Sequence, residues 1–220
     1  MLWPAPAVAL ACAVLTVLAT PWVLRALPEP DPVHADGKPP YASLAGGRFV
    51  ASVGVTALAA TGVATWATPW PHWLAWASLS AVNVLACAID ARTTWLPLPL
   101  ARLGWGVAAS GVGLVAATSG SWVPLAAAAA GAAALGGLFH LLWRTTGAFG
   151  YGDVRLAATI GAVTALGSAR LVFWSLLLGT VAGAVVGIAH RLRGGRGAFP
   201  YGPGLLAGPF LALVLDALSA

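Results

Sequence analysis

Apolar stretches of about twenty residues recur along the whole of this chain, separated by short polar segments. A helix of that length spans the hydrocarbon core of a bilayer, and it satisfies its own backbone polar groups there. Of the 220 residues, 60% are hydrophobic and only 8% are charged, whereas about a quarter are charged in a soluble domain. The sequence therefore predicts an all-α polytopic membrane protein.

Eight apolar segments are long enough to be considered as membrane helices. They lie near residues 6–27, 48–68, 72–90, 101–118, 122–143, 153–167, 170–190 and 204–219. The sixth is short for a complete span. On the seventh, Gly179, Gly183 and Gly187 recur at four-residue spacing and predict a close-packing helix face. We expect a single integral membrane domain over residues 1–220, folded as a bundle of about eight transmembrane helices.

Basic residues mark one side of this bundle. The loops near 28–47, 91–101, 144–152 and 191–203 hold or border ten of the eleven lysines and arginines. Loops rich in these residues stay in the cytoplasm, so we expect a plasma (inner) membrane protein with both termini outside. Arg191, Arg193 and Arg196 are expected to meet anionic lipid headgroups. The bases are scattered rather than gathered on one polar face, which argues against nucleic-acid binding.

Two acids, Asp90 and Asp153, lie at ends of apolar segments on the predicted cytoplasmic side. An ionisable residue at membrane depth is costly and marks a functional site by default. Two carboxylates within a few ångströms of each other share a proton, because both cannot ionise comfortably. The charged member can then take a proton from a water while the neutral member polarises a peptide carbonyl. Such chemistry uses no metal and no cofactor, and we predict neither.

The local sequence supports both positions. After Asp90, Pro97 breaks helical continuation and fixes the loop. Asp153 closes the tetrapeptide Gly150-Tyr151-Gly152-Asp153, in which the glycines permit positive φ and close approach of an extended substrate strand. The alternatives without catalysis are a helix-end acid, solvated or paired with Arg92, for Asp90 and an ordinary N-cap for Asp153. Asp216, near the outer end of the last segment, is better explained as a snorkelling or capping acid than as a third catalyst.

The residues around both aspartates resemble the type IV prepilin peptidase family, the membrane aspartic proteases with a GxGD motif. Three segments carry the resemblance: Ile89-Asp90 with Leu96-Pro97, then Gly150-Tyr151-Gly152-Asp153-Val154-Arg155-Leu156, then Phe199-Pro200-Tyr201-Gly202-Pro203. The family usually has lysine at the position of Arg155, and often a polar or acidic residue at that of Leu98.

The resemblance implies that Asp90 and Asp153 are the catalytic pair, supported by Gly150, Gly152, Arg155 and Pro97. It also implies that the substrates are prepilin-like precursors, cut on the cytoplasmic side after a glycine and before a hydrophobic stretch. Many members carry paired cysteines between the first two helices and methylate the new N-terminus. The loop 28–47 has no cysteine and is short. The chain therefore resembles the shorter peptidases, and we predict neither a zinc site nor methyltransferase activity.

The sequence also leaves other functions to consider. A proton-coupled transporter or channel would place its acids near the bilayer midplane in broken helices, whereas Asp90 and Asp153 lie at helix ends. A non-catalytic scaffold would suit the glycine face but would give the paired acids no role. An intramembrane protease of the presenilin type shares the GxGD chemistry. It more often has tyrosine before its first aspartate, where this chain has Ile89.

Overall fold

The computed structural model describes residues 4–29, 38–147, 149–195 and 199–219. Much of the proline-rich loop 28–47, as well as Arg196, lies outside the described residues. Within those ranges the chain forms helices throughout: α1 (Pro4–Ala26), α2 (Gly47–Ala67), α3 (Trp73–Ala77), α4 (Val84–Thr93), α5 (Leu98–Ser119), α6 (Val123–Thr146), α7 (Tyr151–Thr164), α8 (Ala169–Leu192) and α9 (Gly202–Leu218). Short 3-10 turns, η2 (Tyr41–Leu44) and η3 (Trp70–His72), precede α2 and α3.

The third rod of the bundle changes its helical type near its middle. The π-helical segment η4 (Ser78–Asn83) joins α3 to α4, so that Trp70–Thr93 is one continuous rod. In a π-helix the backbone bonds run from i to i+5, and the side-chain amide of Asn83 here donates to the carbonyl of Ser78 at 2.7 Å. Thr61 of α2 donates a buried hydrogen bond to the hydroxyl of Ser80 (2.9 Å). This bond fixes η4 against α2.

The predicted all-α membrane bundle is confirmed, with eight rods among the described residues once α3 and α4 are joined. Six are long and apolar enough to cross a membrane, while α7 and α9 have 14 and 17 residues. The predicted loop near 91–101 is wrong in its bounds, because α4 runs to Thr93 and α5 begins at Leu98. Pro97 caps α5 and Pro99 lies in its first turn, where a missing N–H costs little. The connection is therefore short, over residues 94–97, and Pro97 ends it at the start of α5.

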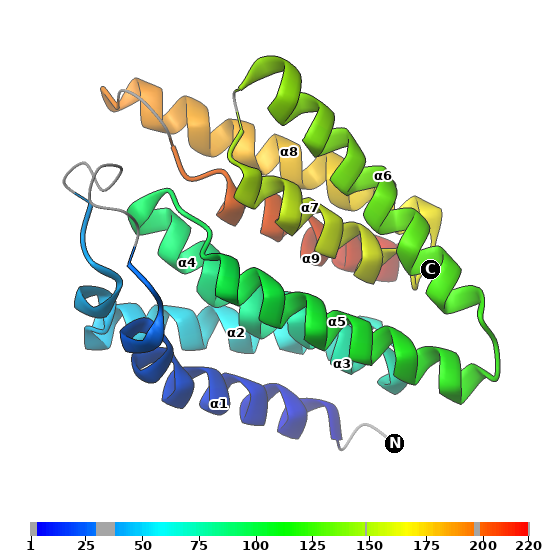
Figure 1. Ribbon diagram of the computed structural model, residues 1–220. Helices are drawn as coiled ribbons and strands as arrows, with labels where there is room; N and C mark the ends of the chain where they lie inside the picture. Colours follow the sequence, from blue (N-terminus) through cyan, green and yellow to red (C-terminus); the bar gives the residue numbers. More distant parts are fainter. Residues whose placement is uncertain (1–3, 30–37, 148, 196–198, 220) are drawn as a thin grey trace.

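The rods run back and forth between two ends of the bundle (Figure 1). The α1–α2, α4–α5, α6–α7 and α8–α9 connections gather at one end, while α1 begins and α9 ends at the other. The last turn of α4 and the first turn of α7 both lie at the end with the four connections. Asp90 and Asp153 therefore face the same end of the bundle, as the sequence predicts.

Glycine faces bring two helix pairs into close contact. Gly131 of α6 and Gly161 of α7 approach so closely that a Cβ on either would collide with the carbonyl oxygen of the other. The predicted glycine face of α8 is confirmed, because Gly179, Gly183 and Gly187 are buried. They lie against Leu205, Tyr201 and Phe199 respectively, at or just before α9. Small residues allow helices to approach in this way where lipid gives no hydrophobic drive for association.

Candidate active site

Asp90 lies in the last turn of α4 and is only 4% exposed. Its Oδ2 atom accepts a hydrogen bond from the backbone N–H of Gly202, the first residue of α9, at 3.0 Å. The N-terminus of a helix carries partial positive charge and favours an anion there. The next residue after α4, Thr94, has a left-handed backbone (φ 56°) and donates its N–H to the Asp90 carbonyl. Asp90 is thus held between the end of one helix and the start of another.

Asp153 occupies the third position of α7 and is 8% exposed. Its Oδ2 accepts from the N–H of Gly150 (3.1 Å), and its own N–H donates to the carbonyl of Gly150 (3.0 Å). The interpretation of Asp153 as an N-cap residue is therefore wrong, since Gly150 is the N-cap and Asp153 reaches back to it from N3. This arrangement orients the carboxylate with the helix backbone itself.

The fold brings the two aspartates together. The negative charge of Asp153 acts directly on the Asp90 carboxyl, and both charges act on the thiol of the buried Cys87. Gly202 lies beside this group, where an added Cβ would come within 2.8 Å of Asp90 Oδ2 and 3.4 Å of Cys87 Sγ. Because Gly202 has no side chain, the N-terminus of α9 can approach the carboxylate of Asp90.

Gly152 brings the two motifs into contact for a reason that differs from the one expected. Positive φ at Gly150 and Gly152 was the wrong expectation: Gly150 has φ −76°, and among the described residues the glycines with positive φ are Gly120, Gly147 and Gly194. Close approach is the reason for Gly152, since a Cβ there would lie 2.7 Å from the Cβ of Leu96. The first turn of α7 therefore packs directly on the α4–α5 turn.

The guanidinium of Arg155 lies 4.9 Å from the centre of the Tyr151 ring. Tyr151 in turn contacts Trp143 (ring centres 5.0 Å apart) and the exposed His140 (6.0 Å). Arg155 thus packs on a cluster of aromatic side chains at the end of α6 and the start of α7. Of the predicted supporting residues, Gly150 bonds Asp153, Gly152 packs on the α4–α5 turn and Pro97 caps α5 beside that turn.

Two residues near the aspartates had no assigned role in the sequence interpretation. Lys38 donates from Nζ to Thr94 Oγ1 (2.9 Å), its ammonium lies 5.0 Å from the centre of the Trp95 ring, and its charge acts on Asp90. Burial first and the negative charge of Asp153 second raise the pKa of the Tyr201 phenol to about 12. The sequence marks Lys38 only as one of many loop bases, and Tyr201 only as part of the third motif.

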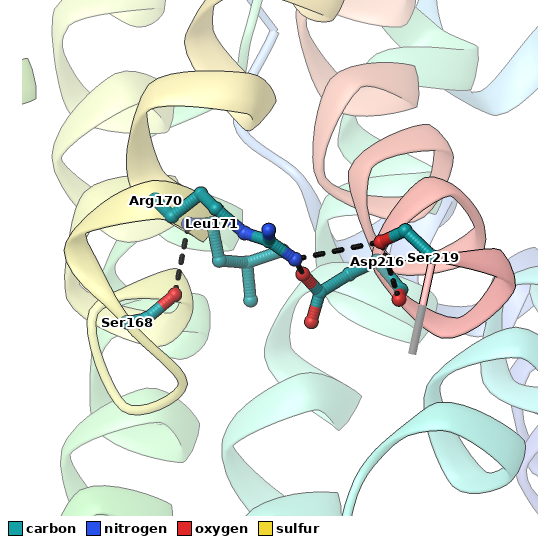
Figure 2. A network of polar contacts seen from close by, with 5 residues as sticks. All are labelled: Ser168, Arg170, Leu171, Asp216 and Ser219. Carbon is teal, nitrogen blue, oxygen red and sulfur yellow. Dashed lines mark hydrogen bonds and ion pairs between the residues drawn. The ribbon is translucent and has the colours of Figure 1, made fainter.

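Asp216 is far from this group, near the end of α9 at the opposite end of the bundle (Figure 1). It forms an ion pair with Arg170, and Ser219 lies beside the same guanidinium (Figure 2). Ser168 caps α8 by accepting from the N–H of Leu171 (3.0 Å). Asp216 is therefore paired locally and joins neither aspartate.

The side chains of the site that could bind a metal ion are the carboxylates of Asp90 and Asp153, the thiol of Cys87 and the phenol of Tyr201. Among the described residues, no three His, Cys, Asp or Glu side chains are grouped so as to hold a metal ion.

Comparison with known proteins gives one match. Residues 77–188 match the family described as the type IV leader peptidase family, and this range includes both Asp90 and Asp153. No curated protein and no solved structure matches the chain.

Proposed function

The chain belongs to the type IV leader peptidase family, and on that premise we propose that it is an aspartic endopeptidase of the plasma membrane. It removes the leader of prepilin-like precursors at the cytoplasmic face, using Asp90, Asp153 and a water molecule. The observation that carries the proposal is the buried, mutually interacting pair of carboxylates at one end of the bundle. No metal or cofactor is needed for this chemistry.

The pair performs hydrolysis by sharing one proton. The ionised carboxylate takes a proton from water as the water oxygen bonds to the scissile carbonyl carbon, and the neutral carboxyl donates a hydrogen bond to the carbonyl oxygen. The tetrahedral intermediate then breaks its C–N bond as the carboxyl that was protonated by water gives that proton to the leaving nitrogen, which returns the pair to one shared proton. The N–H groups of Gly202 and Gly150 hold one oxygen of each carboxylate, which leaves the other oxygen of each for water and substrate.

Charge distribution supports the cytoplasmic orientation. Arg25, Lys38, Arg48, Arg92, Arg102, Arg144, Arg155, Arg191 and Arg193 lie in or next to the connections at the end that holds the aspartates. At the opposite end, Arg170 is already paired with Asp216. Positive loops stay in the cytoplasm, so a substrate would meet the pair from that side.

The direct test is cleavage of a prepilin-like precursor by membranes that contain the chain. We expect a shortened product whose new N-terminus, read by mass spectrometry, is the residue that follows the glycine, at the start of the hydrophobic stretch. Cleavage should continue in excess EDTA, because two carboxylates and water suffice for the reaction. Membranes without the chain are the control. Loss of cleavage in EDTA that zinc restores would contradict the aspartic mechanism, and proton flux without cleavage of any precursor would favour a transporter.

Lys38 gives a second prediction for the same site. Lys38→Met should lower kcat about tenfold, the effect of losing one hydrogen bond from a charged group, because it removes the cation next to Asp90 and releases the Thr94 turn. The KM should change little, since Lys38 is a positioning residue rather than a substrate contact.

Lys38→Arg distinguishes the charge from a purely structural role. An arginine keeps the cation and its contact with the Trp95 ring, so we expect it to restore most of kcat. Arg48→Met, which removes an exposed cation at the same end of the bundle, is the matched control and should behave as the wild type. Equal losses in Lys38→Met and Lys38→Arg, with a lowered melting temperature in both, would assign Lys38 to stability alone.

A further inference from the structure

A groove opens on the side of the bundle between α2, α4 and α9. Its volume is about 220 Å³, and its walls include Thr56 from α2, Cys87 and Ala88 from α4, and Pro203 and Ala207 from α9. Thr56 is exposed, while Ala88 and Ala207 are half-buried. The groove is therefore accessible from outside the bundle. Two of its walls, α2 and α4, belong to segments long and apolar enough to cross a membrane.

One end of this groove lies among the residues that surround Asp90. Cys87 forms part of the wall, and its thiol lies with the Asp90 carboxylate against Gly202. Pro203, the next residue after Gly202, is also in the wall. The groove thus lies next to Asp90, because its wall includes Cys87 and Ala91 of the same helix and Pro203, the neighbour of Gly202.

The groove runs from the pair toward the middle of the bundle. Its α2 wall extends from Ser52 to Ala60, which is about 12 Å at 1.5 Å per residue. Its α9 wall extends from Pro203 to Phe210 in the same direction, because α2 and α9 both start at the end that holds the aspartates. A chain lying in the groove would therefore have one end at the carboxylates and the remainder at membrane depth.

The lining fits an apolar helix. The α4 and α9 walls are apolar, and at Ala88, Ala91 and Ala207 the small side chain lets a second helix approach closely. The hydroxyls of Ser52 and Thr56 donate to carbonyls of their own helix, Phe49 (2.7 Å) and Ser52 (2.8 Å). These hydroxyls are therefore already bonded and offer little to an extended chain. A helix suits this surface, because it satisfies its own backbone hydrogen bonds.

We propose that the α2–α4–α9 groove binds the apolar segment of the precursor that follows the scissile bond, so that the groove sets which peptide bond lies at Asp90 and Asp153. This inference rests on the proposed function. Two other apolar cavities, between α5, α6 and α7 and between α1, the third rod and α5, have no lining residue within four positions of either aspartate. A further cavity between α6 and α8 reaches Tyr201 and is the alternative binding site.

The test fills each cavity in turn and measures cleavage of a full precursor. Thr56→Leu and Ala207→Leu narrow the groove, and we expect each to raise the apparent KM roughly tenfold, as a misfit of a methylene group or more does in an apolar pocket. The kcat should stay within about twofold of the wild type, because neither residue touches the pair. Ala129→Leu, in the cavity between α5, α6 and α7, is the matched control and should leave both constants unchanged.

A shorter substrate separates this inference from the proposed function. A peptide that spans the cleavage site but lacks the apolar segment should be cut equally well by the wild type, Thr56→Leu and Ala207→Leu. Unchanged KM values for the full precursor would overturn the inference and leave lipid as the occupant of the groove. A raised KM in Thr180→Leu alone would move the site to the cavity beside Tyr201. If the wild type cuts neither substrate, it is the proposed function that fails.

Discussion

Asp90→Asn and Asp153→Asn should each reduce precursor cleavage by about 10²–10⁴-fold, because each removes a positioned acid or base from the reaction. Asparagine has nearly the same size as aspartate and keeps a side-chain oxygen that can accept from Gly202 or Gly150. The substitution therefore removes the titratable proton while leaving the backbone contacts in place. Because the two carboxyls act as one unit, the double variant should be little worse than either single variant.

Asp216→Asn is the control for this pair of variants. Asp216 is an aspartate of the same chain, but it lies at the opposite end of the bundle and is paired with Arg170. It is about half exposed, and an exposed ion pair contributes at most about 1 kcal/mol to stability, so cleavage by Asp216→Asn should match the wild type. All variants must be present at equal levels in the membrane. Full cleavage by either Asp90→Asn or Asp153→Asn would remove that residue from the catalytic pair.

Gly161→Leu should strongly destabilise the bundle, by about 3 kcal/mol or more, because overpacking of a close contact forces the backbone to shift. A Cβ at Gly161 would lie within 2.6 Å of the carbonyl carbon of Gly131 and would collide with its oxygen. These are backbone atoms of α6 and cannot rotate away, so the variant has to push α6 and α7 apart. Asp153 lies at the start of α7, and cleavage should fall as well.

Gly137→Leu is the matched control for Gly161→Leu. Gly137 lies on α6, is exposed, and an added Cβ would meet no atom within 4 Å. Leucine is also a better helix former than glycine by up to about 1 kcal/mol, so this variant should be neutral or slightly stabilising. Melting temperatures of the two variants in the same detergent measure the difference. Equal melting temperatures would contradict the close packing of α6 on α7.

The bundle and the shared end of its aspartates follow from the sequence because both depend on local patterns. Apolar length locates a membrane helix, and alternation along the chain then places Asp90 and Asp153 at the same end. Helix ends are less predictable. Pro97 and Pro99 interrupt an apolar pattern, and the same residues suit either a loop or the first turn of a helix. The structure shows the second.

The surroundings of the aspartates could not be predicted, because they depend on contacts between segments distant in the sequence. Lys38 reaches Thr94 across 56 residues, and Asp90 accepts from Gly202 across 112. No periodicity or motif encodes such a pairing. The reason for a glycine at position 152 could not be predicted either. The side chain that excludes a Cβ there is Leu96, which lies in the α4–α5 connection.

The π-helical segment η4 has a consequence for the rotational phase of the third rod. Each residue of an α-helix turns the chain by about 100°, and i to i+5 bonding takes up one residue more per turn than an α-helix does. η4 ends seven residues before Asp90. The direction in which each α4 side chain points from the helix axis, that of Asp90 included, therefore depends on the additional residue in the π-helical turn. Restoring a regular α-helix there would turn Asp90 away from Gly202. The direction of a carboxylate at one end of the bundle is thus set by a change of helical pitch at membrane depth.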